Sequence, residues 1–413
     1  MFIKNIFISL FLWITATSAL AINPTGFSFI CDEEKSCAVQ IKMSDGSLIN
    51  YDLDLDNGAL SQDLSVVVEG KSISINNVDR PLRYSTKTDT DLWGTAVISN
   101  DVLQDGVFLA PDHRIIEIKE GQVAIKMRES QEFADIALPN PDAPELPSLT
   151  DGIPLRIEEN GKLIPFFPNC YVGNAAMHVL KVGIAIDAGF YANAAGNLSP
   201  TSKEGIAKAR AAVDAVVSVG NLVYMQQLHT RIEVDKLTIG TVDSPAPLNY
   251  SAAAGTCRSV MAAQSDFGKW HAEDIKNNPE RQSGSWVFLS LNCFSGVVGV
   301  AWMSSMCGQT NTAVAKADWL IFAHELGHTL GATHSFENGV GTTGGIMDYS
   351  DGKYQGVVQF HPNKRQELCP FLDYAKSRSC KYFNIAPTDS CGDGVLSPPE
   401  ECECIKKGSK SCG

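Results

Sequence analysis

The clearest shortage in this 413-residue sequence is of positive charge, with 33 lysines and arginines against 47 aspartates and glutamates. The formal net charge of −14 opposes binding to phosphate backbones and to anionic membrane surfaces. Long apolar runs are also scarce. The apolar run 6–14 is short for a membrane span, and no other segment is long and apolar enough to cross a bilayer. We therefore expect no nucleic-acid partner and no stable membrane insertion of the mature chain.

The spacing C-x-x-C, which is typical of structural zinc sites, does not occur among the twelve cysteines. The start of the chain indicates a different use for them. Lys4 precedes the apolar residues 6–14, and a small-x-small cleavage sequence, A-L-A, ends at Ala21. We interpret residues 1–21 as a secretory signal peptide. The mature protein is thus expected to be extracellular, with most of its cysteines in disulfides.

The next part of the chain predicts a β-rich domain followed by a linker. Residues 22–138 contain short runs with β-branched alternation, separated by turn pairs such as D-G and N-G. Cys31 and Cys37 are expected to close a local loop there. Residues 139–172 begin with a stretch rich in proline and acid, which is typical of a linker and a suitable place for an activating cut. No R-x-x-R sequence stands directly before the next domain, so the position of the cut stays open.

Residues 173–385 alternate between apolar runs and amphipathic segments, which indicates an α/β domain with a mostly parallel sheet. The expected strands are 179–191, 231–240, 286–292 and 297–303, and the expected helices are 202–228, 259–275, 316–332 and 360–375.

The strongest chemical signal is the sequence H-E-x-x-H-x-x-G-x-x-H. On a helix, His324 and His328 leave the same face one turn apart and can share a metal ion. Gly331 allows a left-handed turn after the helix, which brings His334 back as a third ligand. Three imidazoles leave one position open for water, as in catalytic rather than structural zinc sites. Glu325 stands beside the first ligand, where it can take a proton from that water.

The run H-E-L-G-H-T-L-G-A-T-H, followed by G-I-M-D-Y, resembles the metzincin zinc endopeptidases. This resemblance implies one catalytic Zn²⁺ held by His324, His328 and His334. It also implies that Glu325 acts as general base and acid, and that Met347 forms the Met-turn beneath the metal. The substrates would then be proteins or peptides, cut at internal bonds.

Further stretches resemble the ADAM and reprolysin branch of that family. S-L-N-C-F-S-G-V-V-G-V-A-W-M-S-S-M-C, around residues 297–303, is similar to the segment before the zinc helix in that branch. We expect 297–303 to be an edge strand, to which substrate adds as a further strand. Residues 92–118 resemble the pro-domain of the same branch, which implies that the enzyme is made as a zymogen.

Two residues near the site depart from that branch. Ser335 follows the third histidine, where the branch usually has aspartate. Tyr349 stands two residues after Met347, at the place of a zinc-proximal tyrosine in astacins and serralysins. Two interpretations of Tyr349 remain open: it binds zinc at rest and hydrogen-bonds the developing oxyanion in the transition state, or it packs under the specificity pocket.

Cys170 lies between the linker and the catalytic domain, and two interpretations are open here as well. Its thiolate could fill the open metal position until activation, as a cysteine switch, or it could be part of a disulfide. If Cys31 pairs with Cys37, ten cysteines remain, and a free Cys170 would leave nine. An odd number is disfavoured in a secreted chain.

Residues 386–413 are dense in cysteine, glycine, proline and charge, and resemble the beginning of a disintegrin domain. They lack R-G-D, so integrin binding has no support. Because of this disintegrin-like tail, an alternative function is a catalytically quiet adhesion or binding protein that uses the tail. A structural zinc protein is disfavoured because no fourth protein ligand is evident near the three histidines.

Overall fold

The computed structural model describes most of the chain between residues 23 and 385. The described residues are 23–32, 36–56, 59–74, 82–86, 94–99, 102–110, 114–119, 121–126, 134–144, 146, 170, 177–349 and 359–385. The predicted signal peptide and the disintegrin-like residues 386–413 lie outside them. Within these ranges, none of the helices has the length and apolar character needed to cross a membrane.

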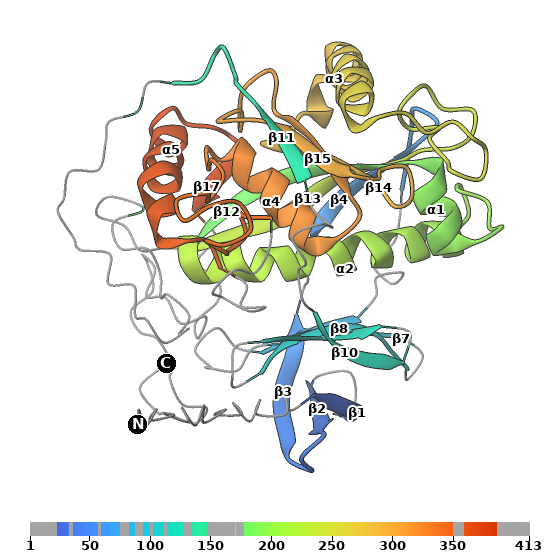
Figure 1. Cartoon of the computed structure of the whole chain (residues 1–413). Coiled ribbons are helices and arrows are strands. Elements are labelled where there is room, and N and C mark those ends of the chain that lie inside the picture. Colours follow the sequence, from blue (N-terminus) through green and yellow to red (C-terminus); the bar gives the residue numbers. More distant parts are fainter. Residues whose placement is uncertain are drawn as a thin grey trace, which may run out of the picture.

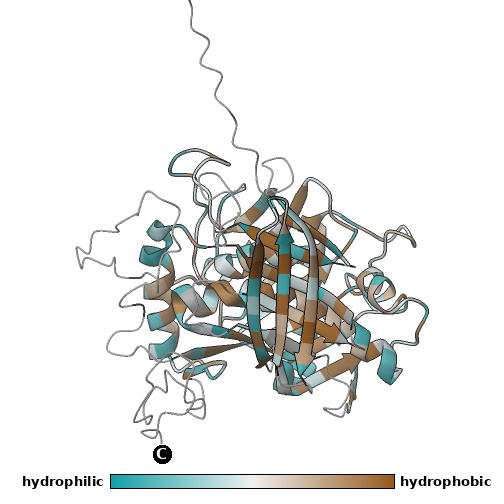
Figure 2. Ribbon diagram, turned by 90° about the horizontal axis from the view of Figure 1, so that it is seen from below, coloured by the Kyte–Doolittle hydropathy of each residue, from teal (hydrophilic) through white to brown (hydrophobic). Residues whose placement is uncertain are grey.

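Most of the N-terminal segment forms an antiparallel sheet, at the bottom of Figure 1. The strands, in spatial order, are β1 Pro24–Asp32, β2 Ser36–Met43, β3 Leu48–Asp56, β6 Leu82–Ser85, β7 Gly94–Ser99, β8 Val102–Leu109, β9 Ile115–Lys119 and β10 Gln122–Lys126. Burial alternates along β2, and Figure 2 shows hydrophilic and hydrophobic residues alternating along strands seen from below. The disulfide Cys31–Cys37 joins β1 to β2, which confirms the predicted local loop.

A larger, mostly parallel sheet forms the upper part of the molecule (Figure 1). The order along it is β11 Ala134–Leu138, β15 Val297–Trp302, β16 Thr312–Lys316, β14 Ser285–Ser290, β12 His178–Ile186, β13 Thr230–Ile239, β4 Leu60–Val68 and β5 Lys71–Ile73, with β17 Phe383–Ile385 beside β12. Strand β15 runs antiparallel to β16, and β5 and β17 are also antiparallel to their neighbours. The predicted α/β class is confirmed.

Helices cover both faces of this sheet (Figure 1). They are α1 Ala188–Ala195, α2 Lys203–Leu228, α3 Val260–Asn277, α4 Trp319–Thr329 and α5 Arg365–Ser377, with short 3-10 turns at Pro279–Arg281 and Pro362–Lys364. Because strand side chains alternate, Trp286 and Phe288 of β14 pack with Phe267 of α3, whereas Val287 and Leu289 join the core beside α2 and α4. Burial on both faces explains why β14 is an apolar run without alternation.

The N-terminal segment does not keep to its own sheet, contrary to the expectation of a separate domain for residues 22–138. Strand β4 pairs in parallel with β13 at one edge of the larger sheet, and β11 pairs in parallel with β15 at the other. Val66 and Val68 of β4 are buried in the same core as the helix α2. This arrangement could not be predicted from the sequence, because a short alternating strand does not indicate which sheet it will join.

Candidate metal centre

Helix α4 carries the first two histidines. Asp318 caps its beginning, since the Asp318 carboxylate accepts a hydrogen bond from the backbone N–H of Leu320 at 2.9 Å. Every residue of α4 is buried. One turn apart, His324 and His328 have ring centroids 4.8 Å from each other. The helix places both rings on one face, as the spacing predicted.

The chain turns sharply after α4 and returns the third histidine to the first two. Gly331 has a φ of +96°, a left-handed conformation that favours glycine. The backbone N–H of Ala332 donates to Gly327 at 3.0 Å and closes the turn. His334 then stacks on Phe336, with centroids 4.7 Å apart, and lies 4.8 Å from the ring of His328. The predicted turn at Gly331 and the return of His334 are both present in the structure.

Backbone carbonyls fix the protonation of the two helical imidazoles. The Nδ1 of His324 lies 2.6 Å from the carbonyl oxygen of Ile346, and the Nδ1 of His328 lies 2.7 Å from that of Ala332. A carbonyl can only accept, so each Nδ1 carries the proton and donates. The Nε2 of each ring therefore presents a lone pair to the space between the rings. Hydrogen bonds of this kind orient histidine ligands in metal sites.

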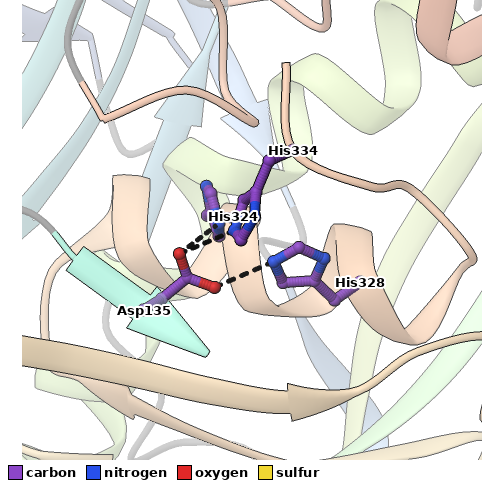
Figure 3. Close-up of side chains that lie close together, drawn as sticks. All are labelled: Asp135, His324, His328 and His334. Atoms are coloured by element: carbon purple, nitrogen blue, oxygen red, sulfur yellow. Dashed lines mark hydrogen bonds and ion pairs between the residues drawn. The ribbon is translucent and has the colours of Figure 1, made fainter. Parts of the chain in front are cut away.

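A fourth side chain reaches the same space from the N-terminal segment. Asp135, on β11, has a fully buried carboxylate that points at the three imidazoles (Figure 3). Its oxygens lie 3.3 Å from the Nε2 of His324, 2.9 Å from that of His328 and 2.8 Å from that of His334. The four candidate ligand atoms all lie within 4.8 Å of one another.

This arrangement fits a divalent metal ion. Tetrahedral ligands about 2.0–2.1 Å from zinc stand roughly 3.4 Å apart, close to the separations seen here. A metal ion held by the three Nε2 atoms and the carboxylate would supply positive charge at the point where these four groups converge.

Glu325 follows His324 on α4 and lies against β15. Its side chain is fully buried, and neither carboxylate oxygen has a hydrogen-bond partner among the described residues. Burial, followed by the negative charge of Asp135, raises the pKa of Glu325 well above its ordinary value. A Cβ atom at Gly299 of β15 would overlap the Glu325 carboxylate, so this carboxylate lies directly against the strand. A buried carboxylate without partners needs a further polar group, such as water or substrate.

Met347 is fully buried beneath α4. A Cβ atom added at Gly327 of this helix would come 2.8 Å from the sulfur of Met347. Its carbonyl accepts a hydrogen bond from the backbone N–H of Ser335 at 2.7 Å, which ties the turn to the third histidine. The carboxylate of Asp348 accepts backbone hydrogen bonds from Gly341, Gly344 and Tyr349 and so shapes the loop around Met347.

Tyr349 lies next to the metal centre, with its ring 5.4 Å from that of His334 in an edge-to-face arrangement. Its hydroxyl donates to the backbone oxygen of Asp135 at 3.2 Å and lies 3.4 Å from the backbone nitrogen of the same residue. Burial, followed by the charge of Asp135, raises the pKa of the Tyr349 hydroxyl. The tyrosine therefore stays protonated and holds the main chain of Asp135.

Two interpretations from the sequence need correction. Cys170 is buried in a disulfide with Cys369, so it has no free thiolate for the metal position; this is the alternative that the parity of the cysteines favoured. A fourth candidate ligand does lie beside the three histidines, although none was evident near the motif. Asp135 stands 189 residues before His324 in a segment without any motif, and no local signal in the sequence marks it.

The family comparison matches the region that contains the three histidines, but not Asp135. Residues 177–377 match a reprolysin model described as metallo-peptidase family M12. A disintegrin and metalloproteinase domain-containing protein B from Aspergillus fumigatus is 27% identical over 182 residues. That match covers 39% of this chain and 21% of the Aspergillus protein, so the chain spans about a fifth of its relative. A solved chaperone–substrate complex matches 84% of this chain and 70% of its own, with 10% identity and a TM-score of 0.35, too low to bear on the fold.

Proposed function

Residues 177–377 are a reprolysin-like metzincin region of metallo-peptidase family M12, and on this basis we propose that the protein is a secreted zinc endopeptidase made as a zymogen. Its substrates would be proteins or peptides cut at internal bonds. The observation that carries the proposal is the buried Glu325 carboxylate, which has no hydrogen-bond partner among the described residues and follows the first of three histidines whose Nε2 atoms converge.

His324, His328 and His334 would hold the zinc. When bound, Zn²⁺ acts as a Lewis acid that polarises the scissile carbonyl and lowers the pKa of the attacking water. The carbonyl oxygens of Ile346 and Ala332 keep the Nε2 atoms of the helical histidines unprotonated for this purpose.

Glu325 would move the proton during peptide hydrolysis. Removal of Asp135, together with a bound cation nearby, would lower the raised pKa of Glu325, so that its carboxylate can take a proton from the water that attacks the scissile carbonyl and then deliver it to the leaving amine. Burial against β15 keeps the carboxylate in one place, and proximity to the reacting atoms depends on that placement. Met347 would form an apolar floor beneath the helix and take no part in proton transfer. Tyr349, whose ring lies 5.4 Å from that of His334, would support the oxyanion once Asp135 has left.

Several features support secretion and synthesis as a zymogen. Four disulfides join cysteines within the described residues, as expected in an oxidising compartment. The N-terminal segment places β11 beside β15, the strand expected to receive substrate. The disintegrin-like tail, on which the adhesion alternative depends, lies outside the described residues.

One observation favours a second candidate, a structural zinc site. Asp135 completes a set of four protein ligands, and structural sites are closed in this way. Glu325 argues against this candidate, because a structural site gives no reason to bury an unpartnered carboxylate next to the ligands. Asp135 also belongs to a segment on the other side of the linker from the histidines.

The test compares Glu325→Gln with the matched control Glu204→Gln, which changes an exposed glutamate on α2. Both variants are cut within the linker, freed of the N-terminal segment, and assayed for zinc content and for hydrolysis of an unfolded protein. We expect one zinc per chain in both, with hydrolysis lost by at least about a hundredfold in Glu325→Gln alone. Equal hydrolysis by the two variants would refute the role of Glu325.

A further inference from the structure

The metal centre contains a ligand that the catalytic motif does not supply. Resting on the proposed function, we propose that Asp135 is a fourth protein ligand of the latent metal centre. We further infer that β11 fills the position of the substrate strand, so that residues 22–138 inhibit the enzyme until the chain is cut between Leu138 and Cys170.

Both oxygens of the Asp135 carboxylate face the Nε2 atoms of the three histidines, as expected for a metal ligand. One oxygen lies near the Nε2 atoms of both His324 and His334, and the other lies near that of His328. The side chain has no exposed surface. A carboxylate at this point occupies the position that three histidines alone would leave open to water, so the attacking water is excluded.

The backbone around Asp135 occupies the edge at which a substrate strand would pair. Strand β15 has β16 on one side and β11 on the other, and Asp135 is in register with Gly299. The contact continues past the strand, where the backbone N–H of Met303 donates to the carbonyl of Leu138 at 2.9 Å. The pairing therefore uses the same main-chain groups that would bind an extended peptide.

The geometry also explains why β11 would not be cut where it lies. A side-chain carboxylate, not a peptide carbonyl, points at the three histidines. The carbonyl of Asp135 is engaged instead by the hydroxyl of Tyr349 at 3.2 Å. No scissile carbonyl of this residue is presented to the metal centre.

Contacts at the opposite side of the molecule anchor the inhibitory strand. Ala59, just before β4, accepts a backbone hydrogen bond from Val234 at 2.6 Å and donates to the carboxylate of Asp214 at 3.1 Å. The indole N–H of Trp319, at the start of α4, donates to Glu117 at 2.6 Å. Residues 22–138 therefore contact the catalytic region at both edges of its sheet and at the zinc helix.

The disulfides define where a releasing cut can fall. The segment 22–138 contains two cysteines, Cys31 and Cys37, and they pair with each other. Cys170 is bonded to Cys369 and stays with the catalytic region. A cut between Leu138 and Cys170 therefore separates the inhibitory strand without any disulfide left to reduce. After the cut, only non-covalent contacts hold the segment in place.

The first test reads the ligand set directly and does not depend on activity. The full uncut chain is reconstituted with Co²⁺ in place of zinc, and its visible absorption is recorded for wild type, Asp135→Asn and Asp142→Asn. Asp142 is an exposed aspartate seven residues further on and serves as the matched control. We expect a shifted spectrum, and zinc release to a chelator at least about tenfold faster, in Asp135→Asn alone.

The second test measures inhibition. A specific protease site is inserted between residues 150 and 160, and the cut but unseparated protein is diluted while hydrolysis is followed. We expect wild type to become active only at low concentration, where the segment dissociates. Asp135→Asn should become active at a concentration at least about tenfold higher, because its segment binds more weakly. Asp135→Glu, which keeps a carboxylate, should lie nearer to wild type than Asp135→Asn does.

The outcomes separate this inference from the proposed function. A Co²⁺ spectrum that is the same in Asp135→Asn and Asp142→Asn overturns the role of Asp135, whether or not the enzyme is active. Dilution curves that coincide for wild type and Asp135→Asn overturn the inhibition. Loss of hydrolysis by the separated wild-type catalytic part, with zinc bound, overturns the proposed function and leaves the spectroscopic result to decide the ligand.

Discussion

Gly299 offers a sharp test of the site, because it is the residue on β15 that faces Glu325. A Cβ atom added there would overlap the Glu325 carboxylate. Ordinary contacts between such atoms are about 3.5 Å, so the carboxylate would have to move by about an ångström or more. The perturbation is Gly299→Ala, which adds one methyl group and no charge.

Such a displacement should affect proton transfer far more than metal binding. General base catalysis contributes about 10²–10⁴-fold, and a misplacement of about 1 Å removes about a hundredfold. We therefore expect kcat/KM of Gly299→Ala to fall by about 10²–10³. The overpacking should also cost about 1–3 kcal/mol of stability. The zinc content should stay at the wild-type value, since the three atoms nearest to the added methyl all belong to Glu325 and none to a histidine.

The assay uses the separated catalytic part, so that any effect of the substitution on β11 does not enter. The matched control is Gly268→Ala in α3, where a Cβ atom would meet nothing within 4 Å. That change should leave kcat/KM unaltered and should stabilise the helix by about 0.5–1 kcal/mol. Full activity of Gly299→Ala would refute the placement of Glu325 against β15 during catalysis.

Three further predictions concern stability and latency. Burial lowers the pKa of His271 to about 4, so the unfolded chain takes up a proton on this residue at a higher pH than the folded chain does. The free energy of unfolding should therefore keep its full value above about pH 6.5 and fall by about 3 kcal/mol as the pH drops toward 4. His271→Gln should flatten this limb in denaturant titrations, and an unchanged limb would contradict the assignment. Replacing Cys170 and Cys369 by serine should cost about 2–5 kcal/mol but leave the uncut chain latent, whereas activity in that uncut variant would restore the cysteine switch. Tyr349→Phe should release the cut segment at a higher protein concentration than wild type, and an identical dilution curve would show that the hydroxyl does not hold Asp135.

The local half of the metal site could be predicted from the sequence. Helical spacing fixes the relation of His324 to His328, and a glycine suited to positive φ explains how His334 returns. These are relations within eleven residues, where backbone geometry leaves little choice. Met347 followed from the resemblance, and the structure places it beneath Gly327.

The remaining half depends on long-range pairing that the sequence does not encode locally. Asp135 reaches the histidines because β11 pairs with β15, and a five-residue strand carries no signal for its partner. Strand β16, Thr312–Lys316, was not predicted, and only its last residue falls within the predicted helix that begins at residue 316. A short apolar run before a helix cannot be distinguished by periodicity. Strand β4 was assigned to the N-terminal domain because its burial against β13 depends on the folded core.

The most direct test of the central claim measures zinc and peptide hydrolysis on one preparation. The separated catalytic part is quantified for bound zinc, and its products from an unfolded protein are identified by mass spectrometry. We predict one zinc per chain and products cut at internal peptide bonds, with both lost together when the zinc is removed and both restored on its return. A chain that holds one zinc and leaves the substrate intact would contradict the account.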